Sequence, residues 1–148
     1  MKKQLIIGHI LSLLLGCLIY ISFRQDTLIM FNWLDRINIL EVISDYRLFS
    51  LPLAKNLPNW FLYSLPDGLW LFSYLSVLLA VWDNTISKNN IHWILLVPAI
   101  AVLTELGQLF LVVPGTFDKL DIIFYILSTI IPILIFTSSK TIKYEKDN

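Results

Sequence analysis

Acidic and amide side chains interrupt the apolar stretches of this sequence at a few positions. The candidates for chemistry are Asp67, Glu105, Gln108, Asp118 and Asp121. Two neighbouring carboxylates can share general acid and base work, or they can hold a divalent cation through oxygen ligands. A group of carboxylates and amides can also form a polar binding pocket. Whether these five residues can act together depends on the segments that carry them.

The composition of those segments is not that of a soluble domain. Of 148 residues, 57% are hydrophobic and only 15% are charged, and the mean hydropathy is +0.72. Soluble domains carry about 25% charged residues. A chain this short has too little interior to remove so much apolar surface from water. The sequence therefore predicts a single membrane domain over residues 1–148, with the lipid bilayer as its main partner.

Charge and cysteine content exclude several other classes. The 11 basic and 11 acidic residues cancel. The basic residues form no run, so nothing favours nucleic-acid binding. Cys17 is the only cysteine, which excludes an internal disulfide and a cysteine-based zinc site. No cofactor and no metal are predicted.

Four apolar stretches have the length that a spanning helix needs. They cover about residues 4–23, 61–82, 91–113 and 120–137. About 20 apolar residues cross a bilayer core. We therefore expect an all-α integral membrane protein, with four transmembrane helices in an antiparallel bundle.

The first stretch allows two interpretations. Gly8, Ser12 and Gly16 recur every four residues, and such a stripe of small residues lets another helix approach closely. Alternatively, the stretch is a lipoprotein signal peptide, cleaved before a lipidated Cys17. Residues 18–23 continue apolar, whereas a mature lipoprotein usually turns polar after the cysteine. We therefore favour an uncleaved spanning helix.

Residues 24–59 form the longest segment between spans. Its apolar residues recur at helical spacing, with polar residues between them: Met30, Trp33, Leu34, Ile37 and Leu40. The pattern predicts an amphipathic helix in the membrane interface, between the first and second spans.

Four spans place both termini on one side of the membrane. That side carries six basic residues: Lys2, Lys3, Lys88, Lys140, Lys143 and Lys146. The other side carries five, mostly spread over one long loop: Arg24, Arg36, Arg47, Lys55 and Lys119. Basic residues in short loops and at helix ends mark the cytoplasmic side. We therefore expect both termini in the cytoplasm.

The alternation of the spans also brings the polar candidates to one depth. Asp67 stands six residues into the second span, roughly 9 Å along a helix. Glu105 stands eight residues before the end of the third span, roughly 12 Å from the same surface. Ionisable groups at the bilayer centre cost at least about 2.5–3.5 kcal/mol and usually face a bundle interior or cavity. We expect all five candidates in one polar pocket in the outer half of the membrane.

Each candidate also has a purely structural interpretation. Asp67 can cap the start of the second helix. Glu105 and Gln108 can be hydrogen-bonding glue between helices. Asp118 and Asp121 can be acids favoured in the first turn of the fourth helix. The residues expected to support the pocket are Trp70, Thr104, Thr116 and Lys119.

Both histidines are expected far from this pocket. His9 and His92 fall near the opposite surface under the same alternation. They are poor partners for the carboxylates, and Cys17 has no base at its own depth. Topology therefore disfavours Ser-His-Asp and Cys-His catalysis.

One part of the sequence resembles a known family. Residues 104–108 (TELGQ), followed by residues 114–121 (PGTFDKLD), are similar to the VanZ-like family of small bacterial membrane proteins. Many members carry an arginine ahead of the aspartates, where this chain has Gly115-Thr116. An arginine pairing with an acid would here be absent or replaced by Lys119.

The resemblance carries over to four of the candidates. They are Glu105, Gln108, Asp118 and Asp121, whereas Asp67 is added from its depth alone. Many members also have Asn and Gly where this chain has Tyr125 and Ser128. Membership implies a role in the bacterial cell envelope and a place in the cytoplasmic membrane.

Two classes of function follow from these patterns. The first is a non-enzymatic factor that binds a lipid headgroup, a glycopeptide-like ligand or a membrane-protein partner through the outer-half pocket. Basic residues on the same side would attract anionic lipid or an envelope precursor. The second is an enzyme acting on a lipid-linked envelope substrate with paired carboxylates or a divalent metal. No nucleophile is specified, which favours the first. Proton-coupled transport ranks last because no charged relay continues toward the cytoplasm.

Overall fold

The computed structural model describes residues 2–137. Every regular element in that range is a helix. The predicted basic and acidic tail, with Lys140, Lys143 and Lys146, lies outside the described residues.

Four helices are long and apolar enough to cross a membrane. The first is a continuous helix over Gln4–Phe23, made of the π-helical segment η1 (Gln4–Leu11) and α1 (Ser12–Phe23). The others are α5 (Ser64–Val81), α6 (Ile91–Leu109) and α7 (Lys119–Phe136). Hydropathy thus predicts all four helices to within a few residues.

Two boundaries differ from the prediction for local backbone reasons. The second span was predicted to start at residue 61, but the short helix α4 (Asn59–Leu62) precedes α5 and is separated from it at Tyr63. The third was predicted to continue to residue 113, but α6 ends at Leu109. Leu111 then has a φ of 58°, a left-handed conformation that no α-helix contains. Apolar composition alone does not reveal either break.

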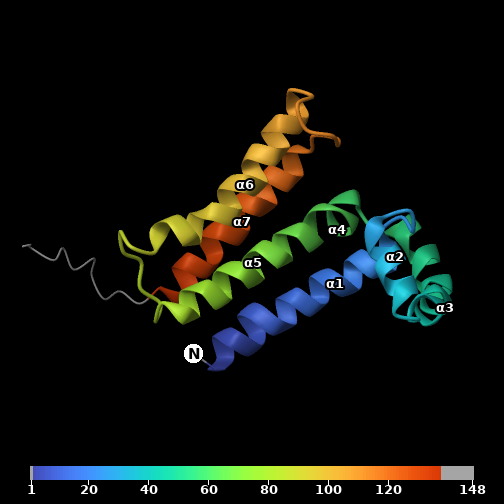
Figure 1. Ribbon diagram of the computed structural model, residues 1–148, viewed down its shortest axis with the longest axis horizontal. Helices are drawn as coiled ribbons and strands as arrows, with labels where there is room; N and C mark the ends of the chain where they lie inside the picture. Colours follow the sequence, from blue (N-terminus) through green and yellow to red (C-terminus); the bar gives the residue numbers. More distant parts are fainter. Residues whose placement is uncertain (1, 138–148) are drawn as a thin grey trace, which may run out of the picture.

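Helix α5 forms the centre of the structure (Figure 1), between α1 and the pair formed by α6 and α7. Half of its apolar window (50%) is buried, against 11% for α7. Leu75 and Leu79 of α5 are fully buried and pack with Ile94 of α6. Because α5 has neighbours on two sides, it carries most of the core.

Small residues bring α1 and α5 together, as the sequence predicts. A Cβ atom on Gly8 would lie 2.9 Å from the hydroxyl of Ser76, and one on Gly16 would lie 2.7 Å from the indole of Trp70. Ser12, between them, is buried. The expectation that this stripe admits a close helix neighbour is confirmed.

Residues 29–50 form two helices, not the single one predicted around residues 30–40. They are α2 (Ile29–Arg36) and α3 (Leu40–Ser50), followed by the 3₁₀ turn η2 (Leu51–Asn56). Asn38 lies between them with a φ of 57°. Asn is one of the few residues that adopts this conformation readily, and it ends the helical pattern there.

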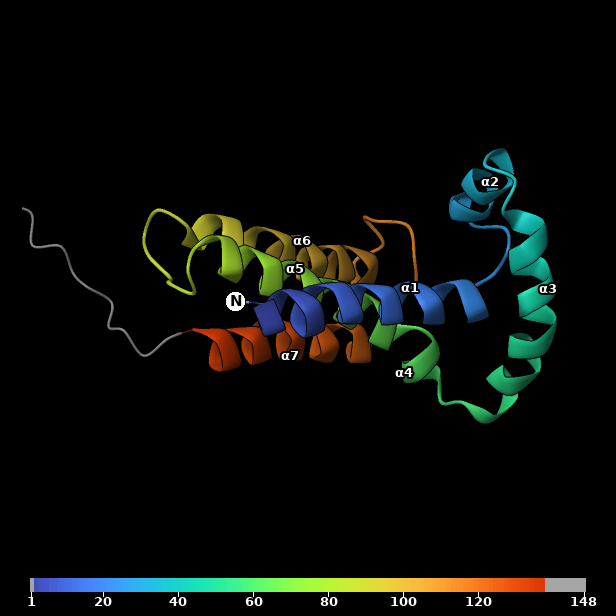
Figure 2. The same ribbon diagram turned by 90° about the horizontal axis from the view of Figure 1, so that it is seen from below.

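Helix α3 lies crosswise at the end of α1 (Figure 2). Its Arg47 donates to the backbone carbonyls of Ile21 and Arg24, and Ser50 donates to the carbonyl of Ser22. The last carbonyls of a helix lack partners within the helix itself. Helix α3 supplies those partners, so it fixes the end of α1.

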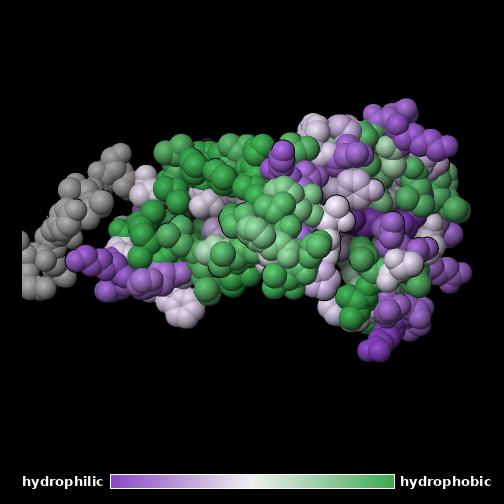
Figure 3. Space-filling model, turned by 90° about the horizontal axis from the view of Figure 1, so that it is seen from above, coloured by the Kyte–Doolittle hydropathy of each residue, from purple (hydrophilic) through white to green (hydrophobic). Residues whose placement is uncertain are grey.

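The surface divides along the same axis (Figure 3). Apolar side chains cover the long helices, and hydrophilic ones gather over α2 and α3. Examples of the exposed apolar residues are Leu14 at 59%, Leu103 at 64% and Leu134 at 75%. Monomeric soluble proteins rarely expose such a continuous apolar surface. This surface is what a multi-pass membrane protein presents to lipid.

Candidate functional site

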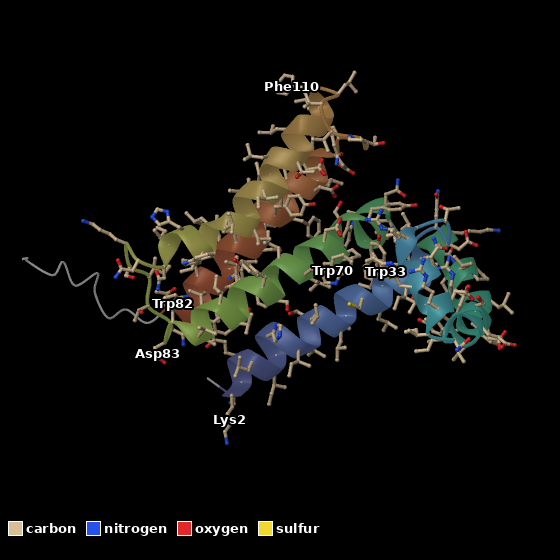
Figure 4. All side chains as sticks on the ribbon, viewed as in Figure 1. Lys2, Trp33, Trp70, Trp82, Asp83 and Phe110 are labelled. Atoms are coloured by element: carbon tan, nitrogen blue, oxygen red, sulfur yellow. The ribbon has the colours of Figure 1, made fainter. Side chains whose placement is uncertain are left out.

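The four long helices run between two ends of the molecule. At one end, which we call the carboxylate end, α1 and α6 finish while α5 and α7 begin. At the other, the Gln4 end, the first helix starts and α5 finishes near Asn84. Figure 4 separates the two: Lys2 and Asp83 lie at the Gln4 end, whereas Trp33, beside the end of α1, and Phe110, at the tip of α6, lie away from it and apart from each other.

An ion pair joins α1 to α5 at the carboxylate end. Nη2 of Arg24 lies 3.4 Å from Oδ2 of Asp67, and the two side chains are 24% and 25% exposed. The same nitrogen donates to the carbonyl of Tyr63 at 3.2 Å. The guanidinium also lies over the rings of Tyr20, at 5.1 Å, and Tyr63, at 5.0 Å. Asp67 therefore pairs with a cation and makes no helix-capping hydrogen bond.

A second contact joins α6 to α7. The buried Glu105 accepts a hydrogen bond from the backbone N–H of Asp118 at 3.2 Å. The side chain of Asp118 in turn accepts from the backbone N–H of Leu120 at 2.8 Å. Asp118 is thus the N-cap of α7, a role that Asp performs well. Its carboxylate is used in starting the helix, which matches the structural interpretation of this residue.

Asp121 has a different environment one turn into α7. Its Oδ1 is buried and accepts no hydrogen bond within the described chain. The carboxylates of Asp121 and Glu105 are both within electrostatic range of Asp67. Three helices therefore deliver one carboxylate each to the same region, as the depth argument predicts.

Gln108 contacts the loop after α6. A Cβ atom on Gly115 would lie 2.7 Å from the side-chain carbon of Gln108, and Gly115 has a φ of 140°. Only glycine fits both the backbone conformation and the close approach. The Gln108 side chain thus packs against the connection between α6 and α7. It forms no hydrogen bond with a carboxylate among the described residues.

The four supporting residues occupy different places. Trp70 packs against Gly16 and lies 5.0 Å from the Tyr20 ring. Thr104 donates to the carbonyl of Ile100 within its own helix. Thr116 and Lys119 are exposed. Among residues 2–137 the only ion pair is that of Arg24 with Asp67, so the cation beside the acids comes from α1 and not from Lys119.

Three residues at this end were not among the sequence-based candidates. Arg24 was interpreted as a basic residue after the first span that helps attract anionic headgroups, not as the partner of an acid. Tyr125 of α7 lies within electrostatic range of Arg24 and of Asp67, Glu105 and Asp121. Ser64, the first residue of α5, is fully buried and its Oγ has no partner in the described chain. The one weak feature of the sequence that indicates Ser64 is its position, as a polar residue close to Pro66 and Asp67.

The Gln4 end contains the histidine that the sequence separates from the acids. Nδ1 of His9 lies 2.8 Å from the hydroxyl of Ser73, and that hydroxyl donates to the carbonyl of His9 at 3.1 Å. The hydroxyl has one proton, which it donates to the carbonyl or to Nδ1 according to the tautomer of the histidine. In either arrangement His9 and Ser73 satisfy each other's hydrogen bonds.

No group of three or more His, Cys, Asp or Glu side chains has the geometry to hold a metal ion within residues 2–137. Comparisons of the chain with family models, with curated proteins and with solved structures gave no match. The assignment of a function therefore depends on the site itself.

Proposed function

We propose that this chain is a VanZ-like protein of the bacterial cell envelope that binds a ligand at its carboxylate end. The ligand would be a lipid headgroup, a glycopeptide-like molecule or a membrane-protein partner. The protein would span the cytoplasmic membrane as an antiparallel four-helix bundle with both termini in the cytoplasm. Helices α2 and α3 would then lie in the outer interface.

The observation that carries this proposal is the set of charged groups at one end. Arg24 directly follows α1, and Asp67, Glu105 and Asp121 come from α5, α6 and α7. Charged groups within spanning segments are costly and typically mark functional sites. A purely structural cluster would pair every charge, yet Oδ1 of Asp121 and Nε of Arg24 are buried without a partner in the described chain.

The crosswise position of α3 supports the interfacial placement. The helix lies roughly perpendicular to α1 (Figure 2). In a membrane that α1 crosses, α3 would therefore lie parallel to the membrane surface. Its side chains Val42 and Phe49 are 68% and 80% exposed, whereas Glu41 and Asp45 supply charge to the same helix. Exposed apolar side chains beside charged ones suit the boundary between headgroups and acyl chains.

Exchange of Glu105 for Gln tests the function. The amide oxygen of Gln can still accept from the N–H of Asp118, so the contact between α6 and α7 persists while the charge is lost. A strain carrying Glu105→Gln is compared with one carrying Asp83→Asn, a carboxylate exchange at the Gln4 end. We expect normal membrane abundance in both, and lost growth under glycopeptide or bile-salt stress only in Glu105→Gln.

Two outcomes contradict the proposal. Normal growth of Glu105→Gln under every envelope stress would remove the functional role of the charge. Reduced abundance that accounts for the whole growth defect would make Glu105 a structural residue. Conversion of a lipid-linked envelope precursor by the purified protein, abolished in Glu105→Gln, would support the enzymatic alternative instead.

A further inference from the structure

Polar atoms without partners are concentrated at the carboxylate end. Within residues 2–137, five buried side-chain nitrogen or oxygen atoms make no hydrogen bond. Four of them belong to this half of the molecule: Arg24 Nε, Ser64 Oγ, Trp70 Nε1 and Asp121 Oδ1. The fifth, in Thr137, is the last described residue. Buried polar groups almost always have hydrogen-bond partners, so four exceptions at one end indicate that a ligand supplies the missing partners.

Helical register places two of these atoms between the same helices. Gly68 of α5 faces Phe124 and Ser128 of α7, since a Cβ there would lie 3.1 Å and 3.0 Å from their side chains. Ser64 precedes Gly68 by one turn, and Asp121 precedes Phe124 by three residues. Residues three or four apart share a helix face. Because α5 and α7 both begin at this end, this register puts Ser64 and Asp121 on the facing sides of the two helices.

The charged groups at this end are of both signs. Arg24 has a buried donor that no acceptor uses, and Asp67 is already paired with it. Glu105 and Asp121 remain as negative charges without a cation among the described residues. A purely anionic ligand would meet these two carboxylates, and a purely cationic ligand would leave the arginine donor unused. A ligand with one charge of each sign satisfies both sides.

We infer that the carboxylate end binds a headgroup that combines a phosphate with a primary amine, as in phosphatidylethanolamine. This inference rests on the proposed function and names the ligand of the same site. Arg24 binds the phosphate, because guanidinium groups match phosphate oxygens well. Asp121 and Glu105 accept from the ammonium, which offers three donors. Ser64 supplies a hydroxyl between the two.

The accessibility of the ion pair fits a lipid ligand. About a quarter of the Arg24 and Asp67 side chains is exposed, so a phosphate can approach this pair from the surface, whereas an ammonium reaches the buried Glu105 and Ser64 only when α5 and α7 separate at this end. The neighbouring Trp60 is 41% exposed and its ring is stacked 5.9 Å from Phe124. Tryptophan is enriched at the level of the headgroups in membrane proteins. The acyl chains of the lipid would then extend along the apolar surface of α7.

Native mass spectrometry of the purified full chain in detergent tests the inference. The protein is offered phosphatidylethanolamine, phosphatidylcholine and phosphatidylglycerol with identical acyl chains. The choline headgroup has no N–H donor, and the glycerol headgroup has no positive charge. A hydrogen bond to a charged group corresponds to about tenfold in affinity. We expect phosphatidylethanolamine to be retained about tenfold more strongly than either of the others.

Variants assign the two halves of the headgroup. Asp121→Asn should abolish the preference for phosphatidylethanolamine over phosphatidylcholine, whereas Arg24→Gln should weaken both. Asp83→Asn, at the Gln4 end, should behave as the unaltered chain. Competition by free O-phosphoethanolamine identifies the source: competition as strong as that by the lipid indicates a soluble ligand of the same chemistry, and weak competition indicates the lipid.

Equal retention of the three lipids would overturn the inference, and so would an unchanged preference in Asp121→Asn. Asp121→Asn keeps the test decisive if Arg24→Gln does not fold. Either negative result leaves the proposed function standing as long as Glu105→Gln is abundant and loses its envelope phenotype. If Glu105→Gln and Asp83→Asn grew equally well under envelope stress, the proposed function would be refuted instead.

Discussion

The two ends of the helices differ in how their buried polar groups are paired. At the Gln4 end, the buried amide side chains Gln4 and Asn90 are neutral and paired: Gln4 donates to the carbonyl of Ser76 at 3.0 Å and to the side chain of Asn84 at 2.7 Å. Asn90 accepts from the N–H of Ser87 and donates to the carbonyl of Thr85. At the carboxylate end, the groups are charged and several of their atoms have no partner.

This difference separates stability from function. A neutral, fully paired network stabilises a helix contact, because each hydrogen bond replaces one that water would otherwise make. Unpaired buried charges destabilise the fold that contains them. Natural proteins retain such groups where activity requires them. The carboxylate end therefore has the character of a binding site. The Gln4 end has the character of a contact that stabilises the fold.

The largest effect on stability is expected from the loss of the only cation in the acid cluster. Arg24→Gln leaves Asp67, Glu105 and Asp121 together without a counterion. An unpaired buried group typically costs about 1–3 kcal/mol. The measurement is the free energy of unfolding in detergent micelles. Arg36→Gln, at an exposed position of α2, should change it by no more than about 0.5 kcal/mol, and similar values for both variants would refute the role of Arg24.

A smaller loss is expected at the Gln4 end. Gln4→Leu removes the donor of two hydrogen bonds, each contributing about 0.5–1.5 kcal/mol, and the buried leucine side chain offsets part of this loss. Thermal unfolding should shift down, while envelope activity per folded molecule should stay unchanged because no ligand binds there. A variant that folds normally but loses activity would show that the Gln4 end also takes part in function.

The start of α7 should respond least and depends on one oxygen. Asp118→Ala removes the N-cap and should cost about 1 kcal/mol. Asp118→Asn keeps a capping oxygen and should be close to neutral. Unfolding midpoints of the two variants compare them directly. Equal losses in both would mean that the negative charge, and not the cap, is what this position supplies.

The sequence predicts the spans well because length and apolar content are sufficient to define them. It also predicts that Asp67, Glu105 and Asp121 share one end, because alternation of the spans requires it. The pairing of Arg24 with Asp67 is not predicted, because the residues are 43 positions apart and hydropathy does not fix the rotation of a helix. Tyr125 was overlooked for the same reason, since an aromatic residue in a span resembles a lipid-facing one.

Asp121 tests the central claim most directly. Replacement by Asn removes a negative charge from beside Asp67 and Glu105 but preserves shape. If the carboxylate end is a binding site, Asp121→Asn should unfold at the same or a higher temperature than the unaltered chain and should still lose envelope activity. A lower unfolding temperature, with activity reduced only in proportion to the amount of folded protein, would contradict the account.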